Sequence, residues 1–249
     1  MPSSILHRLH KFVRIGTDTA ADIAKNGVKS TKRCPLCGKA LRIYWPYGVM
    51  LRPGAQCPHC RCLERHRTLY MYFENHDLFT KENMSLLHFA PETAFIDLFS
   101  AKKNIDYWPV DINPDMPGIR RTADITDIPF EDESMDVIIC NHVMEHIPDE
   151  HKALSEMYRV LKKGGVAVIN VPLDERRAQT FENPEYNTPE LRLKHFGQHD
   201  HVRIYGRDYP QRLAKVFKVE VLEPNRRLSA QELKDYSVWE GDKIYVCRK

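Results

Sequence analysis

Five of the seven cysteines lie within a window of 29 residues in the first quarter of the chain. Four of them form two C-x-x-C pairs separated by 19 residues, Cys34 with Cys37 and Cys57 with Cys60. Two such pairs can bring four thiolates around one tetrahedral zinc ion, as in a zinc ribbon. Because the first residues lack the apolar core of a secretion signal, we expect reduced thiols rather than disulfides. Four protein ligands leave no open position, so we expect a structural zinc.

The fourth zinc ligand is open at this point. Cys62, His59 and His66 lie close enough in sequence to replace one of the four cysteines. All three carry donor atoms that zinc accepts in proteins.

Histidines gather in a second part of the chain. Residues 195–205 contain three histidines, an aspartate, an arginine and a tyrosine. A neutral imidazole is a suitable general base near pH 7, which makes His199 and His201 candidate catalytic bases. Arg203 and Tyr205 are candidate substrate contacts. Alternatively, this stretch is a salt-bridged lid or the edge of a strand.

Two acidic residues have positions that suit a nucleoside ligand. Asp111 lies at the end of the run 106–112, where an acid can accept the hydroxyls of a ribose, as in dinucleotide sites. Asp124 is followed by Ile125, a pair that suits the amino group and the ring face of an adenine. Each aspartate could instead be the N-cap of a helix.

Strand-like and helix-like patterns alternate along the chain and would position these residues. Apolar runs at 85–89, 106–112, 135–140 and 165–171 alternate with helical patterns such as 93–99 and 150–161. This order predicts an α/β fold with a largely parallel sheet covered by helices on both faces. In such a sheet the ligand lies beyond the carboxyl ends of the strands.

Four stretches in this region carry a resemblance: Asp127-Ile-Pro-Phe130, Met135-Asp-Val-Ile-Ile139, Val143-Met-Glu-His146 and Tyr158-Arg-Val-Leu-Lys-Lys-Gly-Gly165. Taken in this order, they resemble class I S-adenosylmethionine-dependent methyltransferases of the type 11 branch. The resemblance covers about 85–247, with an unmatched insertion near 173–200. It implies a Rossmann-like, doubly wound, seven-stranded sheet and S-adenosyl-L-methionine as the cofactor.

The resemblance also implies which residues bind the cofactor. They are His88, Ala90, Glu92, Asp111, Ile112, Asp124, Ile125, Asn141 and His142.

One departure from the family lies after the first strand. The family has an acidic residue followed by G-x-G, whereas this chain has His88, Ala90 and Glu92 at the matching positions. Ala90 is small enough for the backbone to approach a ligand, and Glu92 is expected to contact the amino acid part of the cofactor. Alternatively, this loop has lost the cofactor.

The composition is that of an ordinary globular protein, with 42% hydrophobic and 29% charged residues and a net charge of +3. The first 70 residues are basic, with 13 Lys and Arg against three acidic residues. We expect a basic amphipathic helix within 1–30, a zinc-ribbon-like module with a hinge helix over 31–75, and the methyltransferase domain over 76–249. No apolar run is long enough to span a membrane, and we expect a cytoplasmic protein.

These patterns favour an enzyme that transfers a methyl group to a hydroxyl or amine of a small molecule or sugar. Two alternatives remain. An RNA methyltransferase would use the basic zinc-ribbon region to bind phosphates. A non-catalytic binding module would carry a degenerate cofactor loop. The acceptor and the oligomeric state are not determined by the sequence.

Overall fold

The computed structural model describes residues 32–48, 51–76 and 78–249 of the chain. The basic helix predicted within 1–30 lies outside the described residues. The chain divides into two compact units. The first contains the described residues up to 76 together with Pro224–Asp242, and the second contains Leu78–Glu223 with Lys243–Lys249. The sequence predicted one continuous domain over 76–249, whereas the structure groups Pro224–Asp242 with the zinc-ribbon region.

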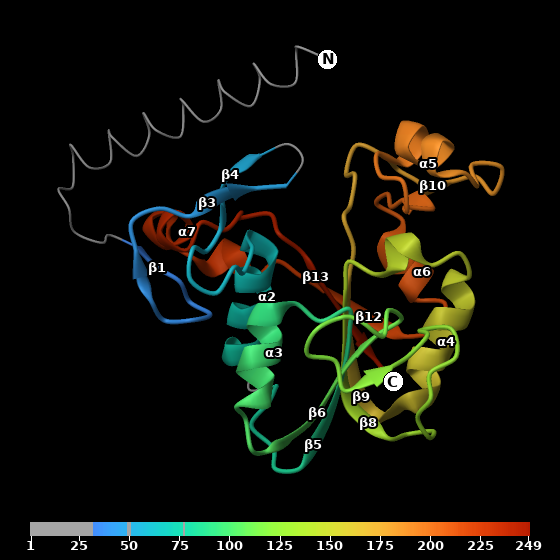
Figure 1. Ribbon diagram of the computed structural model, residues 1–249, viewed down its shortest axis with the longest axis horizontal. Coiled ribbons are helices and arrows are strands. Elements are labelled where there is room, and N and C mark those ends of the chain that lie inside the picture. Colours follow the sequence, from blue (N-terminus) through green and yellow to red (C-terminus); the bar gives the residue numbers. More distant parts are fainter. Residues whose placement is uncertain (1–31, 49–50, 77) are drawn as a thin grey trace. The chain divides into compact units, whose positions relative to one another are not determined.

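A seven-stranded sheet forms the centre of the second unit (Figure 1). In spatial order its strands are β12 (Lys218–Leu222), β13 (Ile244–Arg248), β9 (Leu161–Asn170), β8 (Met135–Asn141), β5 (Met84–Phe89), β6 (Ile105–Asp111) and β7 (Arg121–Thr122). The strands from β9 to β7 are parallel, and β13 is antiparallel to both of its neighbours. The predicted Rossmann-like doubly wound sheet is confirmed.

The order of the strands places the ligand side of this sheet. The chain runs from β5 outwards through β6 to β7, and then returns to β8 on the other side of β5. The direction of winding therefore reverses between β5 and β8. In open α/β sheets the crevice outside the carboxyl ends of the strands at such a switch point is the ligand site.

Helices cover both faces of the sheet. Figure 1 shows α3 (Thr93–Ser100) on one side, and α4 (Glu150–Val160) with α6 (Tyr209–Leu213) on the other. Nearly every residue of β5 and β8 is buried, as expected for strands that are apolar on both faces. α4 begins at Asp149, whose side chain accepts a hydrogen bond from the backbone of Lys152 at 2.9 Å. This cap fixes the end of the loop between β8 and α4.

The insertion near 173–200 forms a small substructure in the second unit. It contains β10 (Phe181–Glu182) and α5 (Pro189–Phe196), and β10 pairs with β11 (Arg203–Ile204). α5 ends at Gly197, which has φ +84° and supplies the left-handed conformation of a helix C-cap. The chain then leads into 201–205.

The first unit consists of two short hairpins and a helix, joined by the later segment Pro224–Asp242. The hairpins are β1 (Lys32–Arg33) with β2 (Ala40–Leu41), and β3 (Trp45–Tyr47) with β4 (Arg52–Gln56), and they precede α2 (Glu64–Asn75). The later segment forms η2 (Pro224–Arg227) and α7 (Ala230–Tyr236).

Hydrogen bonds from α2 connect this later segment to the ribbon. Arg67 Nη2 donates to the backbone oxygen of Ser237 at 2.7 Å, and Thr68 Oγ1 donates to Asp242 Oδ2 at 3.0 Å. Asn225 Nδ2 donates to Thr68 Oγ1 at 2.9 Å. These contacts and the two helices η2 and α7 order the later segment. None of the described helices is long and apolar enough to cross a membrane.

Candidate functional site

A small cavity lies at the carboxyl ends of β5 and β6, on the ligand side of the sheet. Its volume is about 80 Å³. The lining residues are Phe89, Ala90, Asp111, Ile112, Ala123, Asp124, Ile125, Val143 and Ile147. Five of the nine residues predicted to bind a cofactor therefore lie around one cavity. It is smaller than the roughly 300–1,000 Å³ of common ligand pockets, so it suits one part of a nucleoside rather than a whole cofactor.

The two aspartates hold turns at the edge of this cavity. Asp111 Oδ1 accepts a hydrogen bond from the backbone of Asn113 at 2.8 Å. Asp124 Oδ1 accepts hydrogen bonds from both the backbone and the hydroxyl of Thr126, each at 2.8 Å. No helix in the described chain begins at either aspartate, so neither is a helix N-cap. These Asx turns fix both carboxyl groups at the cavity.

The loops that follow β5 and β8 each contain a residue in the left-handed conformation. Ala90 has φ +46° and His142 has φ +59°. Such backbone costs about 1 kcal/mol or more for a residue with a Cβ and is common at functional sites. The Ala90 amide donates to Val110 O at 2.9 Å, and the His142 amide donates to Asn170 O at 2.8 Å. At Ala90 the chain thus adopts the backbone shape that the family's glycine would provide.

Glu92 folds back toward the strand ends and is held by two buried residues. Asn141 Nδ2 donates to Glu92 Oε1 at 2.5 Å, and His88 Nε2 lies 3.2 Å from Glu92 Oε2. His88 Nδ1 lies 3.0 Å from the hydroxyl of Tyr107. His88 is fully buried, whereas the Glu92 side chain is 18% exposed. The prediction of His88 as a cofactor contact needs correction, because His88 lies behind Glu92 and positions it.

A cluster of histidines and one glutamate adjoins the cavity through the loop after β8. Val143 and Ile147 line the cavity, and Glu145 and His146 lie between them in the 3₁₀ helix η1 (Met144–His146). One donor atom from each of Glu145, His146 and His201 lies within 4.8 Å of the others. Sequence reasoning named His201 but overlooked Glu145, although the adjacent Glu-His pair was visible.

Further contacts complete this cluster. His142 Nδ1 lies 3.3 Å from Glu145 Oε1, and the rings of His146 and His201 meet edge to face with centroids 4.7 Å apart. Burial lowers the pKa of His201, so its imidazole is neutral at pH 7. His199, the other predicted base, is exposed and is not part of the cluster.

Arg203 anchors the loop that carries the cluster. Its guanidinium donates to the backbone oxygens of Met144, Ile147 and Pro148 at 2.5–3.0 Å and to the side chain of Glu182 at 2.8 Å. The Tyr205 hydroxyl donates to Met144 O at 3.2 Å and to Glu150 at 2.8 Å. Both side chains are buried. They therefore position the loop, and the prediction of Arg203 and Tyr205 as substrate contacts needs correction.

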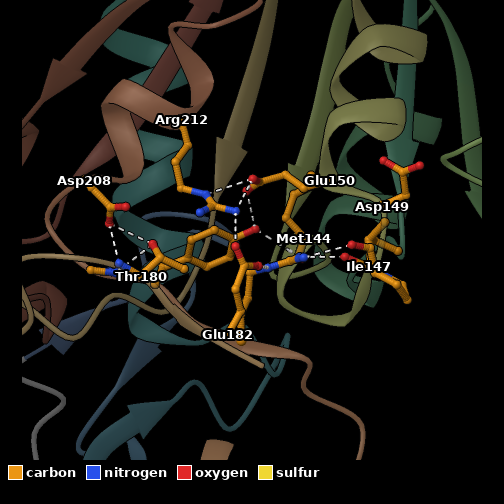
Figure 2. Close-up of polar contacts among 12 residues, drawn as sticks. Met144, Ile147, Asp149, Glu150, Thr180, Glu182, Asp208 and Arg212 are labelled. Atoms are coloured by element: carbon orange, nitrogen blue, oxygen red, sulfur yellow. Dashed lines mark hydrogen bonds and ion pairs between the residues drawn. The ribbon is translucent and has the colours of Figure 1, made fainter. Parts of the chain in front are cut away.

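A second arginine extends this network to α6. Figure 2 shows Arg212 between Glu150 and Glu182, which it contacts at 2.6 and 2.9 Å. The same view shows Asp208 beside Thr180, whose backbone and hydroxyl both donate to Asp208 at 2.7 Å. The insertion is thus attached by charged hydrogen bonds to the start of α4 and to α6.

The four predicted cysteine ligands converge in the first unit. One sulfur from each of Cys34, Cys37, Cys57 and Cys60 lies within 4.8 Å of the others. The pairs Cys34–Cys60 and Cys37–Cys57 have Sγ atoms 3.9 Å apart. Sulfurs at about 2.3 Å from one tetrahedral zinc ion would be about 3.8 Å apart, so this arrangement fits zinc.

The alternative ligands differ in how well they fit. Cys62 Sγ lies 3.5 Å from Cys34 Sγ, which keeps Cys62 as an alternative fourth ligand. His59 is exposed, and His66 Nδ1 accepts a hydrogen bond from the backbone of Leu63 at 3.2 Å. The buried Arg67 lies next to the cysteines, with Nη1 3.8 Å from Cys62 Sγ. At this position its positive charge offsets the negative charge of thiolates.

Comparison with known proteins identifies a family for part of the chain. Residues 91–169 match a family described as methyltransferase domain. A probable S-adenosylmethionine-dependent methyltransferase of Mycolicibacterium smegmatis is 36% identical over 52 residues, 21% of this chain and 20% of the relative. Demethylmenaquinone methyltransferase of Clavibacter sepedonicus is 43% identical over 47 residues, 19% of each chain. The chain thus spans about a fifth of the length of these curated relatives.

Solved structures with a similar chain path have low sequence identity. One is phosphoethanolamine N-methyltransferase 2 of Haemonchus contortus in complex with S-adenosyl-L-methionine. It is 14% identical, with a TM-score of 0.48, and the match covers 74% of this chain and 52% of that one.

Proposed function

We propose, on the premise that residues 91–169 belong to a class I methyltransferase domain, that this protein is an S-adenosylmethionine-dependent methyltransferase. The observation that carries the proposal is the cavity at the switch point. Asp111 at the end of β6 and Asp124 in the loop after β7 border the same small space, beside a left-handed Ala90. When bound, S-adenosylmethionine supplies a methyl group on a positively charged sulfur.

The residues around the cavity would bind the adenosine part of this cofactor. Asp111 would accept the ribose hydroxyls, and Asp124 would accept the amino group of the adenine. Ile112 and Ile125 would contact the faces of the ring. Ile112 is 68% exposed, which is unusual for a large aliphatic side chain. A bound adenine would cover it.

Glu92 would bind the amino acid part. Its carboxylate is held by Asn141 and His88 just after the end of β5, and the side chain is partly exposed. A fixed carboxylate is a strong partner for an ammonium group, because neither charge must be reorganised on binding. Glu92 stands where the resembled family has the second glycine of G-x-G. A contact from its charged side chain would then replace a contact from the backbone. Asn141 and the backbone around His142 would complete this side of the site.

For the acceptor we propose a hydroxyl or amine of a small molecule or sugar. The supporting observation is the polar cluster of Glu145, His146 and His201, which adjoins the cavity through Val143 and Ile147. One relative is named for a small acceptor, demethylmenaquinone. His201, as the buried member of the two predicted bases, is the residue we place on the acceptor side.

In the first unit we propose one structural zinc ion on Cys34, Cys37, Cys57 and Cys60. Four cysteine ligands fill a tetrahedral site and leave no position for a substrate. Zinc would supply the stability that such a small module cannot obtain from its own apolar core.

Two measurements test the methyltransferase proposal. Calorimetry with S-adenosylhomocysteine should show binding of one molecule per chain. Incubation with methyl-labelled S-adenosylmethionine and separate pools of sugars, small hydroxyl compounds, small amines and RNA should place the label in a small molecule.

Each alternative has its own result. Absence of S-adenosylhomocysteine binding would indicate a non-catalytic module with a degenerate loop. Label found only in RNA would replace the small acceptor by a polynucleotide and leave the chemistry unchanged.

A further inference from the structure

Glu145 is a buried carboxylate that is only partly satisfied. Its exposure is 2%, and Oε1 lies 3.3 Å from His142 Nδ1. The other oxygen, Oε2, is buried and has no hydrogen-bond partner among the residues that the structure describes. A buried carboxylate oxygen without a partner carries a desolvation cost that a bound cation would remove.

Two imidazoles converge on this carboxylate. Donor atoms of His146 and His201 lie within 4.8 Å of each other and of a Glu145 oxygen. A neutral imidazole offers one lone pair for coordination, so each of these two histidines can supply one ligand atom. Asp200 Oδ2 lies 3.3 Å from His146 Nδ1, which favours a proton on that nitrogen and a lone pair on Nε2. Carboxylate–histidine pairs of this kind orient metal-binding histidines.

We infer that Glu145, His146 and His201 bind a divalent transition-metal ion beside the cavity. Two histidines and one carboxylate form a ligand set typical of Mn²⁺, Fe²⁺, Co²⁺ or Zn²⁺ sites with open positions, and a poor set for Mg²⁺ or Ca²⁺, which prefer oxygen ligands. His142 adjoins the set through Glu145. This site is separate in sequence and in ligand type from the cysteine cluster.

The fold holds these ligands in place before any ion binds. The backbone amide of Val202 donates to Glu145 O at 2.9 Å, which ties His201 to η1. Arg203 donates to three backbone oxygens of the same loop. Because the loop after β8 and the segment that carries His201 are hydrogen-bonded to each other, little reorganisation is needed on binding.

The location suggests what the metal does. It would lie next to the cavity, because Val143 and Ile147 of the same loop line that cavity. Three protein ligands leave coordination positions for a hydroxyl oxygen of the acceptor, which the metal would orient and make more acidic. This role rests on the proposed methyltransferase function, whereas the metal site itself does not. This role of the metal narrows the expected acceptors to compounds with a hydroxyl group, above all vicinal diols.

Manganese binding tests the site directly, without any turnover. Full-length protein with its cysteine-bound metal retained would be titrated with Mn²⁺ and followed by loss of the free-ion signal in electron paramagnetic resonance. Mn²⁺ prefers oxygen and imidazole ligands to thiolates, so the cysteines should not compete. We expect one saturable ion per chain. Glu145→Gln and His201→Asn should each weaken binding at least tenfold, and Asp200→Asn should weaken it about tenfold.

Controls separate the outcomes. His151→Ala changes an exposed histidine of α4 and should leave Mn²⁺ affinity unchanged. Urea denaturation, measured on every variant, reports whether the protein is folded, and S-adenosylhomocysteine affinity is measured alongside it. The inference is overturned if wild-type protein binds neither Mn²⁺ nor Co²⁺, or if folded Glu145→Gln and His201→Asn variants bind as tightly as wild type. Metal binding without S-adenosylhomocysteine binding would support the metal site and refute the methyltransferase proposal. S-adenosylhomocysteine binding without metal binding would refute the metal site and support the methyltransferase proposal.

Discussion

At the scale of single residues, Asp111 is the residue that we propose to bind the ribose. Its Oδ1 is used in a turn with Asn113, and its carboxyl group borders the cavity. We predict that Asp111→Ala weakens S-adenosylhomocysteine binding by about 1.5–3 kcal/mol, the range for a lost hydrogen bond to a charged group. Calorimetry measures this. Asp115→Ala, at an exposed aspartate of the same loop, is the matched control and should bind normally.

The proposed role of Glu92 can be separated from that of Asp111 by comparing two ligands, one with and one without the amino acid part. Glu92→Gln should weaken S-adenosylhomocysteine binding by about 10- to 100-fold, since the ammonium group loses a charged partner. Binding of 5′-methylthioadenosine, which lacks the amino acid part, should be unchanged in this variant but weakened in Asp111→Ala. Equal losses for both ligands in Glu92→Gln would show that Glu92 acts on the shape of the loop instead.

Some site residues were predictable from the sequence and others were not. Asp111 lies in an apolar run, and the carboxyl end of a parallel strand is a position that sequence alone can locate. Asp124 follows mostly polar residues, and its prediction depended on the neighbouring Ile125 and on the family resemblance. The burial of His88 behind Glu92 was not predictable, because it depends on Tyr107 and Asn141 from neighbouring strands. Glu145 was overlooked for the same reason, since its partner His201 is 56 positions away and reaches it through β11.

At the scale of elements, Arg203 holds β11 against the loop after β8. Replacing it by methionine would leave three backbone oxygens without their partner, and Glu182 would keep only its contact with Arg212. We predict that Arg203→Met lowers the free energy of unfolding by about 3 kcal/mol or more. Urea denaturation measures this loss.

The same experiment includes a control arginine. Arg176 contacts Asp174 at 2.8 Å but its side chain is 90% exposed. Arg176→Met should therefore leave the denaturation midpoint unchanged, because exposed ion pairs contribute little. If both variants unfolded at the wild-type midpoint, Arg203 would not anchor the loop.

The elements of the sheet were largely predictable, and those of the insertion were not. The strands β5, β6, β8 and β9 are apolar runs long enough to show in the sequence. β7, β10 and β11 contain two residues each, too few for any periodicity. Their pairing is set by side chains such as Arg203, and such long-range contacts leave no local pattern.

At the scale of the whole molecule, the first unit is built from two distant parts of the chain. Arg67 links them, because it donates to Gly54, Ala55 and Cys62 as well as to Ser237. The sequence could not show this association, since Arg67 and Ser237 are 170 positions apart.

This association predicts what removal of zinc will do. If zinc stabilises the ribbon, its removal should also release α7, which is about 170 residues further along. Hydrogen exchange of α2 and α7 should rise together after chelation or in Cys57→Ser, while exchange in β5 and β8 stays slow. His59 lies between Cys57 and Cys60 but is exposed, so the His59→Ala variant should retain zinc, and its hydrogen exchange should stay slow. Fast exchange in α2 with protected α7 would contradict the coupling.

The two-part construction of the first unit also sets an order of events during synthesis. The residues up to 76 leave the ribosome about 150 residues before Pro224–Asp242, a delay of roughly 7–30 s at 5–20 residues per second. Throughout that interval Arg67 and Thr68 lack their later partners, and the ribbon has its cysteines but not its closing helix. During synthesis the first unit is therefore incomplete, and it is completed only after nearly all of the sheet has been synthesised.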